Sequence, residues 1–151
     1  MSIRTLQWPV PRPSDLRALI AGIALSLPLT AIAEAEERLG VELNKLEPID
    51  SGCRIYLVFE NALGTKLEAL ELELILFDTE GFIKGRLTLD AAPIDADKTS
   101  VRLFDLAQIE CEQVGRILVN DVLAMAGPDG ALPNEVSRLD LSSKLEVDLF
   151  K

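Results

Sequence analysis

The chain has 151 residues, and its 25 acidic and 15 basic side chains give a net charge of −10. This acidity argues against binding to nucleic acid or to an anionic membrane surface, because both of those surfaces are themselves negative. The sequence contains no histidine, which excludes Ser-His-Asp and Cys-His catalysis and removes the commonest metal ligand, so we expect neither an enzyme nor a cofactor.

Residues 1–33 have the three parts of a cleavable secretory signal peptide. Three arginines precede an apolar run at 18–27, and Pro28 then ends any helix. An Ala-x-Ala cleavage pattern ends at Ala33, so we expect the exported protein to begin at Glu34. An uncleaved anchor is the alternative, but the apolar stretch of 16 residues is shorter than the about 20 that a bilayer requires. A buried core helix is a third interpretation.

The exported part, residues 34–151, has the size of one domain and carries 24 acidic and 12 basic side chains. We expect it to be periplasmic or secreted. It contains two cysteines, Cys53 and Cys111, and an even cysteine count in an oxidising compartment predicts a disulfide. The expected role of this disulfide is structural, because the sequence has no Cys-x-x-Cys arrangement to activate a thiolate. Two buried free cysteines are the alternative.

Alternation of apolar and polar residues, which is typical of strands with one buried face, is the dominant pattern of the exported part. We predict strands, in chain order, at 41–43, 53–59, 70–77, 83–90, 101–104, 114–119, 139–141 and 145–149. The clearest is 70–77, where leucines alternate with glutamates. The 114–119 segment also fits helical spacing, and we expect helix only in short pieces near 34–39 or 111–125.

Short strands with turn signals about every ten residues predict an all-β fold. We expect an antiparallel β-sandwich of the immunoglobulin or fibronectin kind, with a small β-barrel as the second choice. A parallel α/β fold needs long helical patterns between its strands, and the sequence does not contain them.

Four segments resemble known sequences. Residues 42–48 and 52–58 are similar to the start of a group of uncharacterised secreted bacterial proteins, and 76–81 (Leu-Phe-Asp-Thr-Glu-Gly) and 99–105 are similar to its middle. More loosely, the pattern resembles the FxLYD-type immunoglobulin-like modules of bacterial envelope proteins. The resemblance covers most of 41–121 and implies a sandwich fold without a catalytic motif.

The resemblance also bears on the cysteines, because sandwiches of this class can be bridged between the second and the penultimate strand. Cys53 opens a predicted strand, whereas Cys111 precedes one. We therefore expect a disulfide at the margin of the sheets rather than through the centre of the core.

Loop acids are the weak candidates for a metal site. Asp90, Asp95 and Asp97 lie in or beside the loop at 91–98. Calcium binds loop carboxylates, but these three lack the ordered spacing of a calcium loop. The alternative is that they are solvated turn residues whose side chains bond their own backbone.

By elimination, we expect an exported module that binds another envelope protein, for which the edge strands of an open sandwich are suited. The first alternative is a periplasmic protein that binds calcium or a small ligand. The second is a hydrolase that works without histidine, using paired carboxylates.

Overall fold

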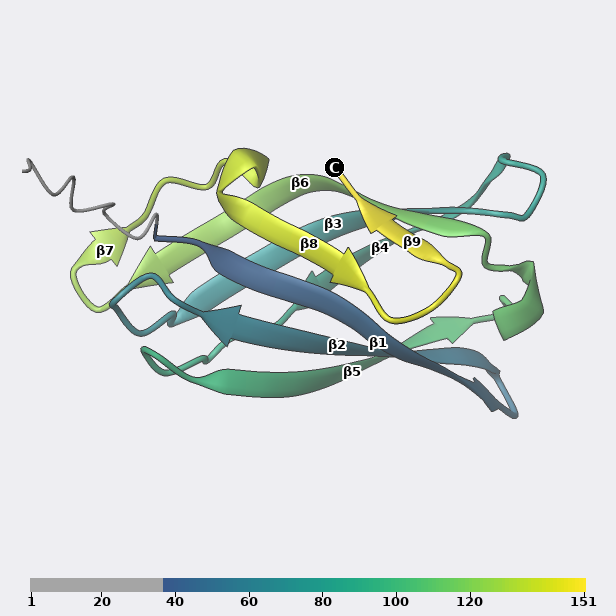
Figure 1. Cartoon of the computed structure of the whole chain (residues 1–151), viewed down its shortest axis with the longest axis horizontal. Helices are drawn as coiled ribbons and strands as arrows, with labels where there is room; N and C mark the ends of the chain where they lie inside the picture. The colour runs from purple at the N-terminus through teal and green to yellow at the C-terminus, as the bar shows by residue number, and fades with distance from the viewer. Residues whose placement is uncertain (1–36) are drawn as a thin grey trace, which may run out of the picture. The chain divides into compact units, whose positions relative to one another are not determined.

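The computed structural model describes residues 37–151, which form nine strands and two short 3-10 helices (Figure 1). In chain order the elements are β1 (Leu39–Ile49), β2 (Gly52–Asn61), β3 (Ala69–Phe77), β4 (Ile83–Asp90), β5 (Thr99–Ala107), η1 (Cys111–Gln113), β6 (Arg116–Gly127), β7 (Gly130–Ala131), η2 (Val136–Arg138), β8 (Leu139–Ser143) and β9 (Asp148–Phe150). The predicted signal peptide, 1–33, and its cleavage point after Ala33 lie outside the described residues.

The strands form two sheets that enclose one core, which confirms the predicted all-β sandwich. The first sheet has the order β5-β2-β1-β8. The second sheet has the order β4-β3-β6-β7, and β9 also pairs with β6. Neither sheet closes on itself, so the small barrel that was the second choice is wrong. Among the described helices, none has the length and apolarity to cross a membrane.

Two strand pairings depart from the antiparallel arrangement that we expected. β8 pairs with β1 in parallel, and β9 pairs with β6 in parallel, so both sheets are mixed. A hairpin turn forces antiparallel pairing, whereas strands that are distant in sequence can pair in either direction. The alternation in the sequence determines which side chains are buried, but it carries no information on pairing direction.

Alternating leucines build the core, as the sequence predicts. On β3, Leu70, Leu72, Leu74 and Leu76 are at most 2% exposed. Burying each such side chain contributes about 2 kcal/mol. The expectation of a helix somewhere in 111–125 is confirmed only at η1, and 116–125 belongs to β6.

β6 is twice as long as the strand predicted at 114–119, because bulges interrupt its alternation. Its pairing with β3 shifts between Glu71 and Leu72 and again between Glu73 and Leu74. Each shift inserts one extra residue into β6, Leu123 and Asn120 respectively. A bulge places two residues opposite one, so the period of two that identifies a strand is lost at both places.

The predicted disulfide joins Cys53 to Cys111, with 4.9 Å between the Cα atoms. Cys53 is the second residue of β2 and is fully buried, whereas Cys111 opens η1 and is partly exposed. The bridge therefore lies at the margin of the sheets, as expected. At the start of β2, Gly52 has φ of 142°, and a Cβ there would lie 2.2 Å from the carbonyl oxygen of Leu106, so only glycine fits this turn.

Candidate functional site

The outer face of the first sheet carries the candidate site, and the strand register places its residues in rows. In one row Asp140 (β8), Gly40 (β1), Glu60 (β2) and Thr99 (β5) are neighbours. In the next row on the same face, Ser142, Glu42, Val58 and Val101 are neighbours. Four strands from distant parts of the sequence thus contribute side chains to one surface.

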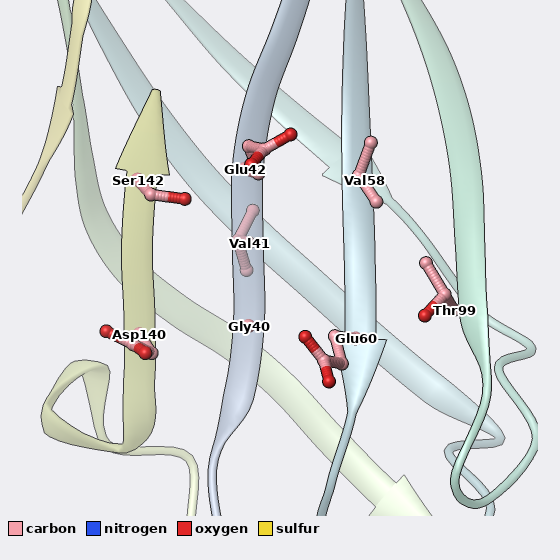
Figure 2. Close-up of a pocket in the computed structure, with 8 residues that line it drawn as sticks. All are labelled: Gly40, Val41, Glu42, Val58, Glu60, Thr99, Asp140 and Ser142. Atoms are coloured by element: carbon pink, nitrogen blue, oxygen red, sulfur yellow. The ribbon is translucent and has the colours of Figure 1, made fainter. Parts of the chain in front are cut away.

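A shallow pocket of about 150 Å³ lies across these two rows (Figure 2). Its lining residues are Gly40, Val41, Glu42, Val58, Glu60, Thr99, Asp140 and Ser142. The pocket exists because Gly40 has no side chain: a Cβ at this position would lie 3.2 Å from the Cβ of Glu60. In Figure 2 the Glu60 carboxylate extends toward Gly40 from β2, and Asp140 stands on the opposite side on β8.

The three carboxylates of this pocket differ in their partners. Glu42 accepts a hydrogen bond from Asn44 at 2.9 Å, and Lys144 Nζ lies 3.3 Å from its second oxygen. The Asn44 bond, followed by Lys144, lowers the pKa of Glu42, so this carboxylate is ionised at neutral pH. Within the part of the chain that the structure describes, neither Glu60 nor Asp140 forms an ion pair. The pocket therefore has an excess of negative charge.

At the other end of the same face the charges neutralise one another. Lys45 Nζ lies 2.9 Å from Glu47 and 4.9 Å from the centre of the Tyr56 ring, and the Tyr56 hydroxyl donates to Glu47. The Tyr56 bond, followed by Lys45, lowers the pKa of Glu47, and the same bond raises the pKa of Tyr56. Beside this group Arg54 binds Asp105 through two bonds of 2.6 and 3.0 Å, which lowers the pKa of Asp105.

An apolar strip runs along β5: Val101 lies in the second row of the pocket, and Leu103 lies in the row of Lys45 and Tyr56. Val101 and Leu103 on β5 are 50% and 47% exposed, and they pair with Val58 and Tyr56 on β2. Exposed large apolar side chains that lie together, with polar neighbours around them, are typical of a surface that contacts another molecule. The face thus combines an anionic pocket with an apolar strip beside it.

The three aspartates predicted as weak metal candidates have separate roles: a bond to the backbone, an ion pair and a turn conformation. Asp90 Oδ1 accepts a hydrogen bond from the N–H of Ala92 at 3.0 Å, and Asp95 lies 3.4 Å from Lys98. Asp97 has φ of 54°, a turn conformation. Within residues 37–151, no group of three or more Cys, Asp or Glu side chains is placed to hold a metal ion.

Sequence reasoning did not find the pocket, because its lining comes from four strands whose pairing the sequence does not reveal. One signal was present: Gly40 lies inside an apolar segment, and a glycine within a strand marks a bulge or a close approach of another group. That signal identifies a gap in the sheet surface, but it does not identify Glu60 and Asp140 as its neighbours.

Comparison with known proteins supports the fold. No protein-family model and no curated protein matches this chain. A solved structure of IrmA from Escherichia coli resembles it with a TM-score of 0.57 and 14% sequence identity, covering 69% of this chain and 90% of the IrmA chain. At that identity the likeness concerns the fold alone, and it does not test the resemblance to FxLYD-type modules.

Proposed function

We propose that this protein is an exported, non-catalytic β-sandwich module that binds another envelope protein through the outer face of its first sheet. The observation that carries the proposal is the anionic pocket at Gly40, where Glu60 and Asp140 form no ion pair with any residue of 37–151, directly beside the exposed Val101 and Leu103. Export is supported by the Cys53–Cys111 disulfide, a bond that persists in oxidising compartments.

The size of the pocket favours a side chain of a protein over a free small molecule. Pockets for small molecules have volumes of about 300–1,000 Å³, whereas this one has about 150 Å³. The ammonium group of a lysine or the guanidinium group of an arginine matches both the volume and the charge. Guanidinium groups bind carboxylates through paired, charge-assisted hydrogen bonds, so an arginine of the partner is the best fit between Glu60 and Asp140.

The apolar strip would supply most of the binding free energy, because the charges alone contribute little. Exposed ion pairs contribute only about 0.2–1 kcal/mol each, so the pocket would orient a partner more than hold it. Apolar side chains of the partner that cover Val101 and Leu103 would add about 25 cal/mol for each Å² removed from water. The proposed partner therefore presents an arginine or lysine next to apolar residues.

Titration with Nα-acetyl-arginine amide, followed by ¹H-¹⁵N NMR spectroscopy, tests the pocket. We expect the amide signal of Gly40 to shift on addition of this compound and not on addition of the neutral analogue Nα-acetyl-citrulline amide. Glu60→Gln and Asp140→Asn should each reduce the shift, whereas the matched variant Glu71→Gln, on the other sheet, should not. Equal shifts with both compounds would refute a site for a cation.

Photo-cross-linking in intact cells tests the partner. A benzoyl-phenylalanine residue at position 101 should give one specific adduct, and the same residue at Leu123, which is 42% exposed and belongs to the second sheet, should not give it. Adding Glu60→Lys to the position-101 variant should abolish that adduct. An adduct that is equally strong from both positions, or that persists with Glu60→Lys, would contradict this binding face.

A further inference from the structure

β4 forms an edge of the second sheet, and within residues 37–151 no strand pairs with its outer side. β3 is the only described element with which β4 has an extensive contact. The β3–β4 turn, whose end projects from one end of the sandwich in Figure 1, carries the exposed Phe82 (69%), and the exposed Ile83 (67%) is the first residue of β4. Open edges with unpaired peptide groups are templates for pairing with another strand.

β5, one of the two edge strands of the first sheet, is protected in a way that β4 is not. The carbonyl oxygen of Val101 accepts a hydrogen bond from Arg102 Nη1 at 3.2 Å. The same guanidinium group donates to the carbonyl oxygens of Ala91 and Pro93, which ties the 91–93 loop to β5. No comparable side chain covers the edge of β4 within the described residues.

One hydrogen bond between β3 and the end of β4 shows which peptide groups of β4 have no partner in the sheet. The N–H of Ala91, just beyond β4, donates to the carbonyl oxygen of Leu70 at 2.9 Å. In an antiparallel pair the residues that exchange hydrogen bonds alternate along the strand, so the odd-numbered residues from 85 to 89 bond to β3. Arg86, Thr88 and Asp90 therefore point their N–H and C=O groups away from the sheet.

The charges of β4 are self-complementary. Lys84 lies near one end of the strand and Asp90 at the other, with Leu87 between them, whereas Arg86 forms an ion pair with the buried Glu73 of its own copy. If two β4 strands pair antiparallel about Leu87, each Lys84 lies opposite Asp90 of the other copy, and each Arg86 opposite Thr88. In this register the outward N–H and C=O groups of Arg86 in one copy face those of Thr88 in the other copy, so the two residues can exchange hydrogen bonds. A register centred on Arg86 would instead place like charges opposite each other, which is destabilising.

We infer that β4 is an interface between two copies of this chain, which pair their β4 strands antiparallel about Leu87 and join their second sheets into one. The contact is isologous, so it closes as a twofold dimer. It pairs the free peptide groups of both edges and covers Leu87, which is only half-buried in one copy. The outer faces of both first sheets stay accessible, so the dimer presents two copies of the pocket at Gly40.

Sedimentation velocity over a series of protein concentrations tests this inference. The wild-type protein should show a monomer–dimer equilibrium. Lys84→Asp and Asp90→Lys each create two like-charge pairs in the dimer, and each should weaken the dimer by about tenfold or more. An equimolar mixture of the two variants restores both pairs in the heterodimer and should regain the wild-type Kd. Lys66→Asp and Asp129→Lys, which change net charge equally outside β4, should dimerise normally.

Thr88→Pro is an independent test of the edge. The Thr88 N–H points away from β3, so proline removes no hydrogen bond of the monomer, a position at which edge strands tolerate it. The variant should keep the wild-type circular dichroism spectrum and sediment as a monomer. The inference is overturned by a wild-type protein that stays monomeric at every concentration, by a Thr88→Pro dimer of unchanged Kd, or by a charge-reversed mixture that stays dissociated.

Discussion

Removing the disulfide should destabilise the protein without changing its native structure. The Cys53→Ala, Cys111→Ala variant releases a loop that spans 58 residues. In the chain-entropy model, a closed loop of this length lowers the entropy of the unfolded chain by an amount worth about 4 kcal/mol. For a domain of this size, that loss lowers Tm by roughly 15 °C.

The native fold around the bridge should persist, because hydrogen bonds hold the bridged segment on both sides. Before η1, the N–H of Gln108 donates to the carbonyl oxygen of Ser51 at 2.8 Å. After η1, the N–H of Gly115 donates to the carbonyl oxygen of Phe77 at 2.8 Å. The disulfide therefore acts mainly on the unfolded chain, and the amide NMR spectrum of the variant should differ from the wild-type spectrum only near the two substituted positions.

Urea denaturation of the oxidised wild type, the reduced wild type and the double-alanine variant measures this effect. The reduced protein and the variant should both lose about 4 kcal/mol, and agreement between them would exclude a packing defect caused by alanine. A loss below about 1 kcal/mol in both would refute the entropic reasoning. So would a reduced protein that is much more stable than the variant, because alanine packing would then account for the loss.

Three further predictions follow from the core and from the outer face of the first sheet. Leu72→Ala should lower the free energy of unfolding by about 2–5 kcal/mol in urea denaturation, because Leu72 is fully buried; a loss under 1 kcal/mol would mean that the core collapses around the cavity. Asn61→Ala should cost about 2–3 kcal/mol, because the buried Asn61 amide donates to the carbonyl oxygens of Thr65 and Asp95 and these would lose their donor; a near-neutral result would contradict this role. The pKa of Glu47 is lowered in the folded protein, so the stability it contributes is present above its unfolded pKa of about 4.3 and is lost as pH falls through the folded value. Glu47→Gln should therefore make the stability of the protein less dependent on pH in acidic solution, and an unchanged profile by urea denaturation at several pH values would rule this out.

The parts of the fold that the sequence predicted are those in which alternation continues without interruption. In β3 every second residue from Leu70 to Leu76 is buried, because this strand lies between β4 and β6 and faces the core. In β6 the extra residues Asn120 and Leu123 interrupt the pattern, so only its first third, 116–119, was recognisable. The disulfide was predictable from cysteine count and compartment, independently of any strand.

The candidate site was predictable only in part. The sequence predicts an acidic protein, and its binding to another protein stays a prediction. The sequence drew attention to Asp90, Asp95 and Asp97, which lie at the end of β4 and in the loop after it and do not line the pocket. The pocket depends on register: Glu60 and Asp140 become neighbours of Gly40 because β1 lies between β2 and β8. Nothing in a local pattern encodes a parallel pairing between segments so far apart in the chain.

The parallel pairing of β1 with β8 also has a kinetic consequence. Leu39 lies opposite Leu139, and contacts between residues so distant in sequence form slowly, because the loop that joins them must close first. The hairpin of β1 and β2 can form early, and it carries Glu60 on one side of Gly40, but Asp140 arrives only when β8 docks. A chain in which β8 has not yet docked therefore has one wall of the pocket and not the other, and we expect the proposed binding to require that docking.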